Sequence, residues 1–381
     1  MDKNRLDPYY REFPITRQYI YLDHAGVAPI SLRVKEAIER FLSESAGGAA
    51  FHYPAWAQRI ADIRRTCAKL IASDPDEIAF VKSTSHGLSL VAEGLDWKPG
   101  DNLLVHGKEF PSNLYPWLNL QRKGVEIRYI PSQDNRVLTG DVERLMGPRT
   151  RLLAISSVQF TTGFRADLRT LGGLCRHKNV LFCVDAIQSL GVIPMDVQAF
   201  KIDFLSADAH KWLCGPEGIG LFYCRKGLAE RLSPPLIGWK SVQNEFAFEQ
   251  PDFRLKTSAL RFEEGSMNLL GIFGLGAAIE LLLEIGIANI EKRVLDLGDL
   301  IIREAEKRGY PIRTPLERDG RGGNITFSGP FDPAQVRDAL RDRNIMVNVR
   351  GGGLRVSPHF YSTDADILKL FGSIDSILLQ R

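Results

Sequence analysis

Residues 184–224, VDAIQSLGVIPMDVQAFKIDFLSADAHKWLCGPEGIGLFYC, contain two charged residues that stand where apolar runs end. Asp185 closes the run VLFCVD (180–185), and Lys211 follows the run DFLSADA (203–209). Burying an ammonium group is costly unless the group is paired or neutral, so a lysine in these surroundings needs a chemical reason. Taken singly, Asp185 is also suited to cap the next helix, and Lys211 to extend to the surface.

The pattern of short apolar runs continues outward from this stretch. Four further runs are EIAFVKST (77–84), DNLLVHG (101–107), VEIRYIPS (125–132) and RLLAISSV (151–158). Amphipathic helical patterns such as ADLRTLGGLCRHK (166–178) separate them. Nearly continuous apolar runs are typical of parallel strands buried on both faces, so we expect an α/β fold with helices on both sides of a mostly parallel sheet. Ligands collect at the carboxyl ends of such strands, which directs attention to the residues after each run.

The two ends of the chain follow other patterns. SLRVKEAIERFL (31–42) predicts a helix, and the stretch 45–56, with its glycines and aromatics, predicts a loop. The helix places one set of apolar residues on a single face: Val34, Ala37, Ile38, Phe41 and Leu42. The C-terminal segments predict a compact α+β unit, with strands at 323–329, 345–349 and 353–358 and helices at 333–343 and from Thr363.

The pattern changes near residue 285. Residues 267–287 are long and apolar, but Glu280 and Glu284 interrupt them, which favours a buried core helix over a membrane span. We expect a large ligand-binding domain over 15–285 and a small α+β domain over 286–381 together with residues 1–14.

Composition narrows the class of protein. The 381 residues are 44% hydrophobic and 25% charged with a net charge of +3, which is ordinary for a globular protein and favours neither nucleic acid nor a membrane as partner. The five cysteines form no CxxC pair and predict buried thiols in a reducing compartment. Because residues 1–13 carry charges and no apolar signal segment, we expect a cytoplasmic protein. The seven histidines show no HExxH or similar metal-binding spacing, so no metal site is predicted.

Asp185 and Lys211 together match the needs of one cofactor, pyridoxal 5′-phosphate (PLP). PLP requires a lysine for its Schiff base and an acid opposite its pyridine nitrogen, so that the protonated ring takes up electrons from the substrate. An aspartate at one strand exit and a lysine beyond the next strand supply both groups.

Residues 184–224 resemble the core of the class V aminotransferase family of fold-type I PLP enzymes, through Asp-x-x-Gln at 185–188 and His-Lys at 210–211. This family includes cysteine desulfurases, selenocysteine lyases and isopenicillin-N-epimerase-like proteins. The resemblance extends from YLDHAGVAP (21–29) to GLRVSPHFYSTDADI (353–367). It implies a large domain with a mostly parallel mixed sheet covered by helices, a smaller α+β C-terminal domain, and a homodimer with shared active sites.

The resemblance assigns residues to the cofactor ring. Lys211 becomes the Schiff-base lysine and proton carrier, and Asp185 the partner of the pyridinium nitrogen. Gln188 is expected to form a hydrogen bond with the phenolic oxygen of the cofactor, and Ile187 is expected to pack on one face of the ring. Phe110, in EFPSN, takes the stacking position on the other face, where desulfurases usually carry histidine.

A second group is expected near the cofactor phosphate. Thr84 and Ser85 stand at the start of a predicted helix, where hydroxyls and free N–H groups form a phosphate cradle. The resemblance places His210 beside the phosphate and Ser266, in EGSMN, against the phosphate of the neighbouring subunit. Asp208 stands where many relatives have a phosphate-binding serine or threonine, so we expect it to be turned away or paired with His210.

Three residues are expected on the substrate side. Arg355 matches the arginine that binds the substrate α-carboxylate, for which a planar guanidinium is suited. His24 lies where the N-terminal segment of the family enters the active site, and Gln159 stands where desulfurases have an asparagine beside cofactor and substrate.

The expected activity is PLP-dependent chemistry on an amino acid or amine. Residues 344–355 contain no cysteine, whereas desulfurases need one there to accept sulfur, so we place an aminotransferase first. A C–S lyase or an epimerase on the same fold remains open. A non-catalytic protein that kept the fold, or an aldolase that uses Lys211 alone, leaves the Asp185–Lys211 pair or the phosphate cradle unexplained.

Overall fold

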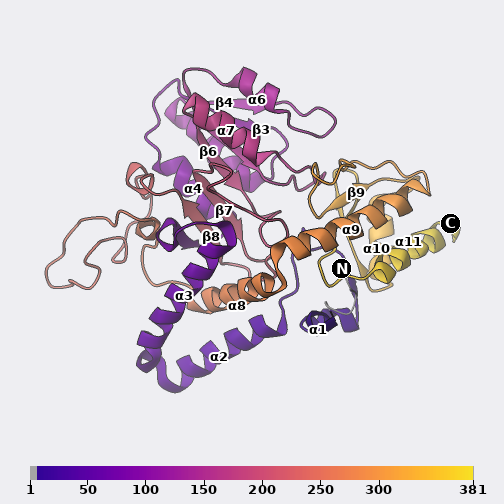
Figure 1. Ribbon diagram of the computed structural model, residues 1–381, viewed down its shortest axis with the longest axis horizontal. Coiled ribbons are helices and arrows are strands. Elements are labelled where there is room, and N and C mark those ends of the chain that lie inside the picture. The colour runs from indigo at the N-terminus through magenta and orange to yellow at the C-terminus, as the bar shows by residue number, and fades with distance from the viewer. Residues whose placement is uncertain (1–6, 381) are drawn as a thin grey trace.

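The computed structural model describes residues 7–380, which form a large unit around a central sheet and a smaller C-terminal unit (Figure 1). The sheet has seven strands in the order β2-β8-β7-β6-β5-β3-β4. Their bounds are β2 (Ile78–Val81), β3 (Asn102–His106), β4 (Glu126–Ile130), β5 (Thr150–Ser156), β6 (Leu181–Asp185), β7 (Phe204–Asp208) and β8 (Gly220–Cys224). Strand β8 is antiparallel to β2 and β7, and the other neighbours pair in parallel. The predicted mostly parallel mixed sheet is confirmed.

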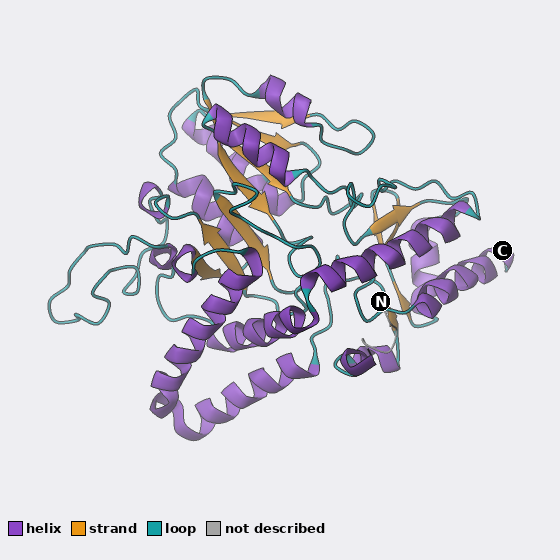
Figure 2. Ribbon diagram, viewed as in Figure 1, coloured by secondary structure: helices purple, strands orange, loops and turns teal. Residues whose placement is uncertain are grey.

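Helices cover both faces of this sheet (Figure 2). Successive strand residues alternate between two hydrophobic cores, as Leu103 and Val105 do against Leu104 on β3. One face packs on α4 (Thr84–Gly94) and α5 (Tyr115–Leu118), and the other on α3 (Tyr53–Ile71), α7 (Leu168–Lys178) and α8 (Leu269–Ile285). The short helix α6 (Thr139–Leu145) follows β4. Because both faces of the inner strands are covered, these strands are mostly apolar, which explains the nearly continuous runs in the sequence. The edge strand β4 differs, since Glu126 and Tyr129 are exposed.

The predicted loop at 45–56 is wrong. Helix α2 (Leu32–Gly48) extends to Gly48, a short turn covers Ala49–His52, and α3 (Tyr53–Ile71) begins directly after it. Two glycines in the last turn of α2 cost about 1 kcal/mol each, but the helix packs through Val34 against α8 and tolerates them. The chain reverses instead at Ala49, which has φ 44°.

The long apolar segment forms α8 (Leu269–Ile285), a mostly buried helix as expected. Among the described residues no single helix is long and apolar enough to span a membrane. Only α8 and α9 (Ile287–Glu306) taken as a pair meet that measure, and they are bent by 78°. The bend falls at Gly286, and α9 runs on to the C-terminal unit (Figure 1).

The C-terminal unit contains a small antiparallel sheet with the order β11-β12-β9. Its elements are β9 (Ile325–Phe327), α10 (Pro333–Arg341), β11 (Asn348–Arg350), β12 (Gly353–Val356) and α11 (Asp364–Leu379). Leu22 joins the core of this unit, although it falls within the range predicted for the large domain. The domain division itself stays a prediction, and residues 1–6 of the predicted small domain lie outside the described part of the chain.

The segment 345–349 is two strands, where the sequence suggested one. Strand β10 (Ile345–Met346) pairs in parallel with β1 (Ile20–Tyr21), which follows the short N-terminal helix α1 (Asp7–Tyr10). After Val347 the chain changes sheets and continues as β11. This change of sheet carries Asn348 and Arg350 to the edge of the cavity described next.

Candidate active site

A cavity of about 340 Å³ lies at the carboxyl ends of β6 and β7, where the sequence pattern predicts a ligand. Most of the predicted site residues line it: Thr84, Ser85, Phe110, Asp185, Ile187, Gln188, Asp208, His210, Lys211 and Arg355. Other lining residues come from the N-terminal segment and from the β11–β12 hairpin. The fold therefore brings together residues from both ends of the chain and from the central sheet.

Lys211 is the only lysine among the described residues that line this cavity. Its side chain is buried, and no described carboxylate lies within ion-pair distance of its Nζ. Burial lowers the pKa of Lys211 to about 8, partly opposed by the negative charge of Asp185. Nζ lies 5.4 Å from the centroid of the Phe110 ring. A buried amine with a lowered pKa is suited to nucleophilic attack on an aldehyde.

The backbone around Lys211 is fixed by its neighbours. Trp212 donates from Nε1 to Oε1 of Gln188 at 2.9 Å, and Gln188 donates from Nε2 to the carbonyl of Ala25 at 3.0 Å. The turn closes through the Cys214 N–H, which donates to the Lys211 carbonyl at 2.9 Å, with Cys214 at φ 54°. Gln188 thus orients the lysine loop while it lines the cavity.

Asp185 is buried at the end of β6 and accepts a hydrogen bond from the Ile187 N–H at 3.0 Å. Burial raises its pKa to about 6, although the Ile187 N–H and the Lys211 charge favour the carboxylate. Ile187 and Phe110 both line the cavity, and the Phe110 ring meets Phe160 edge-on at 5.2 Å. The structure thus places a buried acid and two apolar side chains around one space.

The start of α4, where the phosphate cradle is predicted, lies at the cavity. The first N–H groups of a helix have no partner within the helix, and α4 begins at Thr84 with Ser83 as its N-cap. Thr84 Oγ1 accepts from the Asp208 N–H at 3.0 Å, and Ser85 Oγ donates to Ser112 Oγ at 2.8 Å. Asp208 itself pairs with His210, with 3.1 Å between Oδ1 and Nδ1. The acid that stands in place of a serine or threonine is therefore paired within its own loop.

The β11–β12 hairpin and the N-terminal segment form the opposite wall. Arg355 is fully buried and donates from Nη2 to Asp23 Oδ1 at 3.0 Å and from Nη1 to the Phe160 carbonyl at 3.0 Å. Its Nε is buried without a hydrogen-bond partner in the described chain. A guanidinium at the wall of a cavity, with one buried N–H that has no partner, is suited to bind a carboxylate.

Three predicted residues do not line the cavity, namely His24, Gln159 and Ser266. His24 is fully buried, with 2.6 Å between its Nε2 and the Tyr361 hydroxyl, and burial lowers its pKa well below the usual range. Gln159 donates to the Lys108 carbonyl and accepts from the N–H groups of Thr161 and Thr162, so it shapes a loop. The expectation that these two touch substrate is not supported by their positions.

Ser266 lines a separate pocket of about 190 Å³ together with Lys82 and His86. Its predicted contact is with the phosphate of a neighbouring subunit, which a single chain does not test, so that role stays a prediction.

Sequence reasoning missed Asp23 and Asn348, which line the cavity, and left Arg350 without a role. Asp23 Oδ2 accepts from Asn348 Nδ2 at 2.8 Å. A sequence signal for Asp23 existed, because it lies beside His24 in YLDHAG, but the pattern does not show which of the two faces the cavity. For Asn348 the sequence gives no signal, since its place depends on the change of sheet after Val347.

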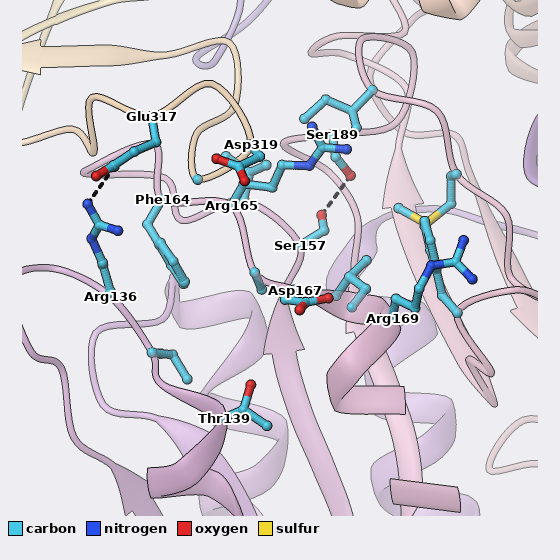
Figure 3. A pocket seen from close by; sticks show the side chains of 18 of the residues that line it. Arg136, Thr139, Ser157, Phe164, Arg165, Asp167, Arg169, Ser189, Glu317 and Asp319 are labelled. Atoms are coloured by element: carbon cyan, nitrogen blue, oxygen red, sulfur yellow. Dashed lines mark hydrogen bonds and ion pairs between the residues drawn. The ribbon is translucent and has the colours of Figure 1, made fainter. Parts of the chain in front are cut away.

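A larger cavity of about 710 Å³ lies between the large unit and residues 317–320 (Figure 3). It contains the Arg136–Glu317 ion pair at 2.6 Å and reaches the Ser157–Ser189 hydroxyl pair at 2.6 Å. None of the predicted site residues lines it, so size alone does not locate the chemistry. Over residues 7–380 no cluster of histidine, cysteine or acidic residues has the arrangement of a metal site.

The residues that line the cavity at the carboxyl ends of β6 and β7 fit PLP. A buried lysine without an anionic partner, a buried acid and a helix N-terminus open onto one cavity of the size usual for small-molecule sites. Together with the mixed parallel sheet, they define the class of protein as a fold-type I PLP-dependent enzyme.

Comparison with known proteins gives the family. The chain belongs to the family described as Aminotransferase class-V, which matches residues 20–370. It is 29% identical over 400 residues to a probable cysteine desulfurase of Methanothermobacter thermautotrophicus, covering 98% of both chains. Among solved structures it is similar to an apo cysteine desulfurase from Thermococcus onnurineus, with a TM-score of 0.90, 25% identity and 98% of both chains covered.

A structure of the enzyme C-DES with glycine covalently linked to its PLP cofactor has the same fold. Its TM-score is 0.87 at 22% identity, and the match covers 95% of this chain and 98% of C-DES. The predicted family, fold and PLP cofactor are confirmed.

Proposed function

We propose that this protein is a PLP-dependent lyase that cleaves the carbon–sulfur bond of a cysteine-type α-amino acid and releases the sulfur to solution. The observation that carries this proposal is one cavity that joins Lys211, Asp185 and Arg355 while the hairpin beside it has no thiol. The desulfurase names of its relatives support sulfur chemistry.

Each residue has a task that follows from its surroundings. Arg355, with its unused Nε–H, holds the substrate carboxylate and so fixes the Cα–H bond relative to Lys211. Lys211 removes the Cα proton, because its lowered pKa increases the fraction of neutral amine. PLP, when bound, withdraws the electrons of the broken C–H bond, and Asp185 supports this by keeping the pyridine nitrogen protonated. Loss of the β-sulfur with its bonding electrons then leaves, after hydrolysis, pyruvate, ammonia and a thiol.

The cysteines of the chain determine the fate of the sulfur. All five (Cys67, Cys175, Cys183, Cys214, Cys224) lie within the described residues, and none is more than 2% exposed. Burial raises the pKa of each thiol, which removes thiolate character at neutral pH. A protein-bound persulfide is therefore disfavoured, and a small thiol or sulfide is the expected product.

Transamination is the second candidate. The missing sulfur acceptor favours it as well, since a transaminase needs Lys211 and Asp185 but no thiol. The two reactions differ in the step that follows removal of the Cα proton. In transamination the proton returns to the cofactor, whereas in the lyase reaction the β-substituent leaves.

A homodimer is part of the proposal. Ser266 lies outside the cavity of its own chain, so its predicted phosphate contact requires a second subunit. Light scattering of the purified protein should give twice the mass of 42.7 kDa.

The reaction is tested by incubating the PLP-loaded enzyme with L-cysteine, L-cystine, S-methyl-L-cysteine and L-alanine. The proposal predicts pyruvate and a thiol or sulfide in equal amounts from a sulfur amino acid, with no activity in Lys211→Ala. Conversion of the cofactor to its pyridoxamine form, without pyruvate release from sulfur amino acids, would show that the enzyme is a transaminase and not a lyase.

A further inference from the structure

The loop that carries Lys211 is held from the C-terminal unit as well as from the large unit. His359 lies between β12 and α11, where its side chain is fully buried. Its Nε2 lies 3.0 Å from the carbonyl oxygen of Trp212, the residue that follows Lys211. These two residues are 147 positions apart in the chain, so the contact joins the C-terminal unit to the lysine loop.

The position of the ring proton on His359 follows from a second contact. Its Nδ1 accepts a hydrogen bond from the Phe360 N–H at 2.8 Å, so the proton of the neutral imidazole is on Nε2. Nε2 therefore donates to the Trp212 carbonyl. Burial lowers the pKa of His359 to about 4, although the bond to this carbonyl opposes the shift. The ring is thus a neutral, fixed donor at neutral pH.

A second buried histidine supports His359. The ring centroids of His24 and His359 lie 5.1 Å apart. His24 is itself held at both nitrogens, since Nδ1 lies 2.9 Å from the Ser357 carbonyl oxygen and Nε2 lies 2.6 Å from the Tyr361 hydroxyl. Both partners of His24 lie within two residues of His359 in the chain, so these contacts fix the segment from which the His359 ring extends.

The side chain of Trp212 is packed by the same unit. The indole is fully buried and lies against Gly323, where a Cβ would collide with the ring. Its Nε1 donates to Gln188 at 2.9 Å, as described above. Trp212 is therefore held at its side chain and at its carbonyl. Because one peptide bond joins it to Lys211, a shift of Trp212 would move the base of the lysine side chain.

The position of Lys211 decides how much water reaches its amine. The lysine side chain is buried, and this burial is the main cause that lowers its pKa to about 8. If the loop loosened, Nζ would reach water, and the pKa would rise toward the value of about 10.4 that an exposed lysine has. A contact that holds the loop therefore also sets the reactivity of the amine.

We propose that His359 is a positioning residue for the lysine that carries the cofactor: its Nε2–H holds the Trp212 carbonyl and so keeps Lys211 in its dry place at the cavity. The inference rests on the part of the proposed function that assigns PLP to Lys211. It holds for a lyase and a transaminase alike.

The test measures the pH at which PLP loads the apoprotein at half its maximal rate, in the wild type and in two amide variants. In His359→Gln the amide nitrogen reaches the place of Nε2 and donates to the Trp212 carbonyl, so the midpoint should stay close to that of the wild type. In His359→Asn the shorter amide reaches only the place of Nδ1. The bond to Trp212 is then lost, and the midpoint should rise by about one pH unit.

A milder variant acts on the backbone of the same histidine. Ser362 Oγ accepts from the His359 N–H at 3.1 Å, and Ser362→Ala removes this bond. The midpoint should rise by a smaller amount than in His359→Asn. This variant takes the place of His359→Asn if the latter does not fold.

Thr314→Val is the control for a general loosening of the C-terminal unit. The buried Thr314 Oγ1 accepts from the Thr326 N–H at 2.9 Å, and Thr314 is not among the residues that line the cavity. Loss of this bond should lower the free energy of unfolding in urea, as His359→Asn does, but should leave the midpoint of loading unchanged.

A midpoint in His359→Asn equal to that of the wild type, or equal shifts in the two amide variants, would overturn the inference. The same shift in Thr314→Val would also overturn it, because any weakening of the C-terminal unit would then act on Lys211. A wild-type midpoint near 10.4, or no visible band at any pH, would instead refute the role proposed for Lys211.

Discussion

Asp208 Oδ1 lies 3.1 Å from His210 Nδ1, so the acid beside the phosphate cradle is paired with a histidine of its own loop. The same oxygen accepts the Ala209 N–H at 2.9 Å, which holds the carboxylate in its loop. The Asp208 carboxylate is therefore held by groups of its own loop at the edge of the cavity.

This pairing makes a prediction about PLP affinity. In His210→Ala the Asp208 carboxylate loses its partner and repels the phosphate, so PLP should dissociate about tenfold more readily, equivalent to about 1.4 kcal/mol. Asp208→Asn/His210→Ala should restore much of the affinity. Equilibrium titration of the apoprotein with PLP measures both, with His177→Ala on the exposed end of α7 as control. If the His210→Ala variant binds PLP as tightly as the wild type does, this result would contradict the pairing of Asp208 with His210.

The lowered pKa of Lys211 predicts how loading depends on pH. Only the neutral amine attacks the PLP aldehyde, so the loading rate of apoprotein should rise with pH and reach half its maximum near the pKa of about 8. Asp185 raises the pKa of Lys211, so Asp185→Asn should move the midpoint to lower pH. Absorbance after mixing apoprotein with PLP gives the profile. A midpoint near 10.4, the value of an exposed lysine, would show that the amine is not desolvated.

Asp185 should matter for turnover more than for cofactor retention. Replacing the carboxylate by an amide in Asp185→Asn leaves the shape intact but removes the charge that keeps the ring nitrogen protonated, so kcat should fall about 100-fold to 1,000-fold. Steady-state assays on fully PLP-loaded protein test this. Asp196→Asn is the control, because the Asp196 side chain accepts from the Ala199 N–H in a turn away from the cavity. Loss of PLP with kcat per bound cofactor unchanged would assign Asp185 a purely structural role.

Gln159 should contribute to stability and not to substrate binding. Its side chain holds the Lys108 carbonyl and two backbone N–H groups, all of which Gln159→Ala leaves without these partners. The free energy of unfolding should fall by about 2–4 kcal/mol in urea titrations. The KM of the loaded enzyme should change less than twofold. An unchanged free energy of unfolding together with a raised KM would show that Gln159 acts in substrate binding.

The central sheet and the residues at its strand exits were predictable from sequence, because buried parallel strands give continuous apolar runs and ligands meet their carboxyl ends. Asp185 and Lys211 follow from that rule directly. His24 was misplaced for a local reason: the chain turns directly after Asp23, and the cavity receives Asp23 while the core receives His24. Gln159 was misplaced because a buried amide that satisfies backbone groups looks, in sequence, like a ligand-binding amide.

In the wall formed by the N-terminal segment and the β11–β12 hairpin, sequence reasoning predicted Arg355 but not its neighbours Asp23 and Asn348. The wall depends on the parallel pairing of β1 with β10, which joins residues near opposite ends of the chain, and on the change of sheet at Val347. No local pattern specifies either contact. The domain division, the dimer and the cytoplasmic location stay predictions.

The most direct test of the account is to find the residue that carries PLP. The purified protein, loaded with PLP and reduced with borohydride, is digested and mapped by mass spectrometry. The account predicts one pyridoxyl-modified peptide, with the group on Lys211, and no visible band or modified peptide in Lys211→Ala. A pyridoxyl group on another lysine, or a band that persists in Lys211→Ala, would contradict it.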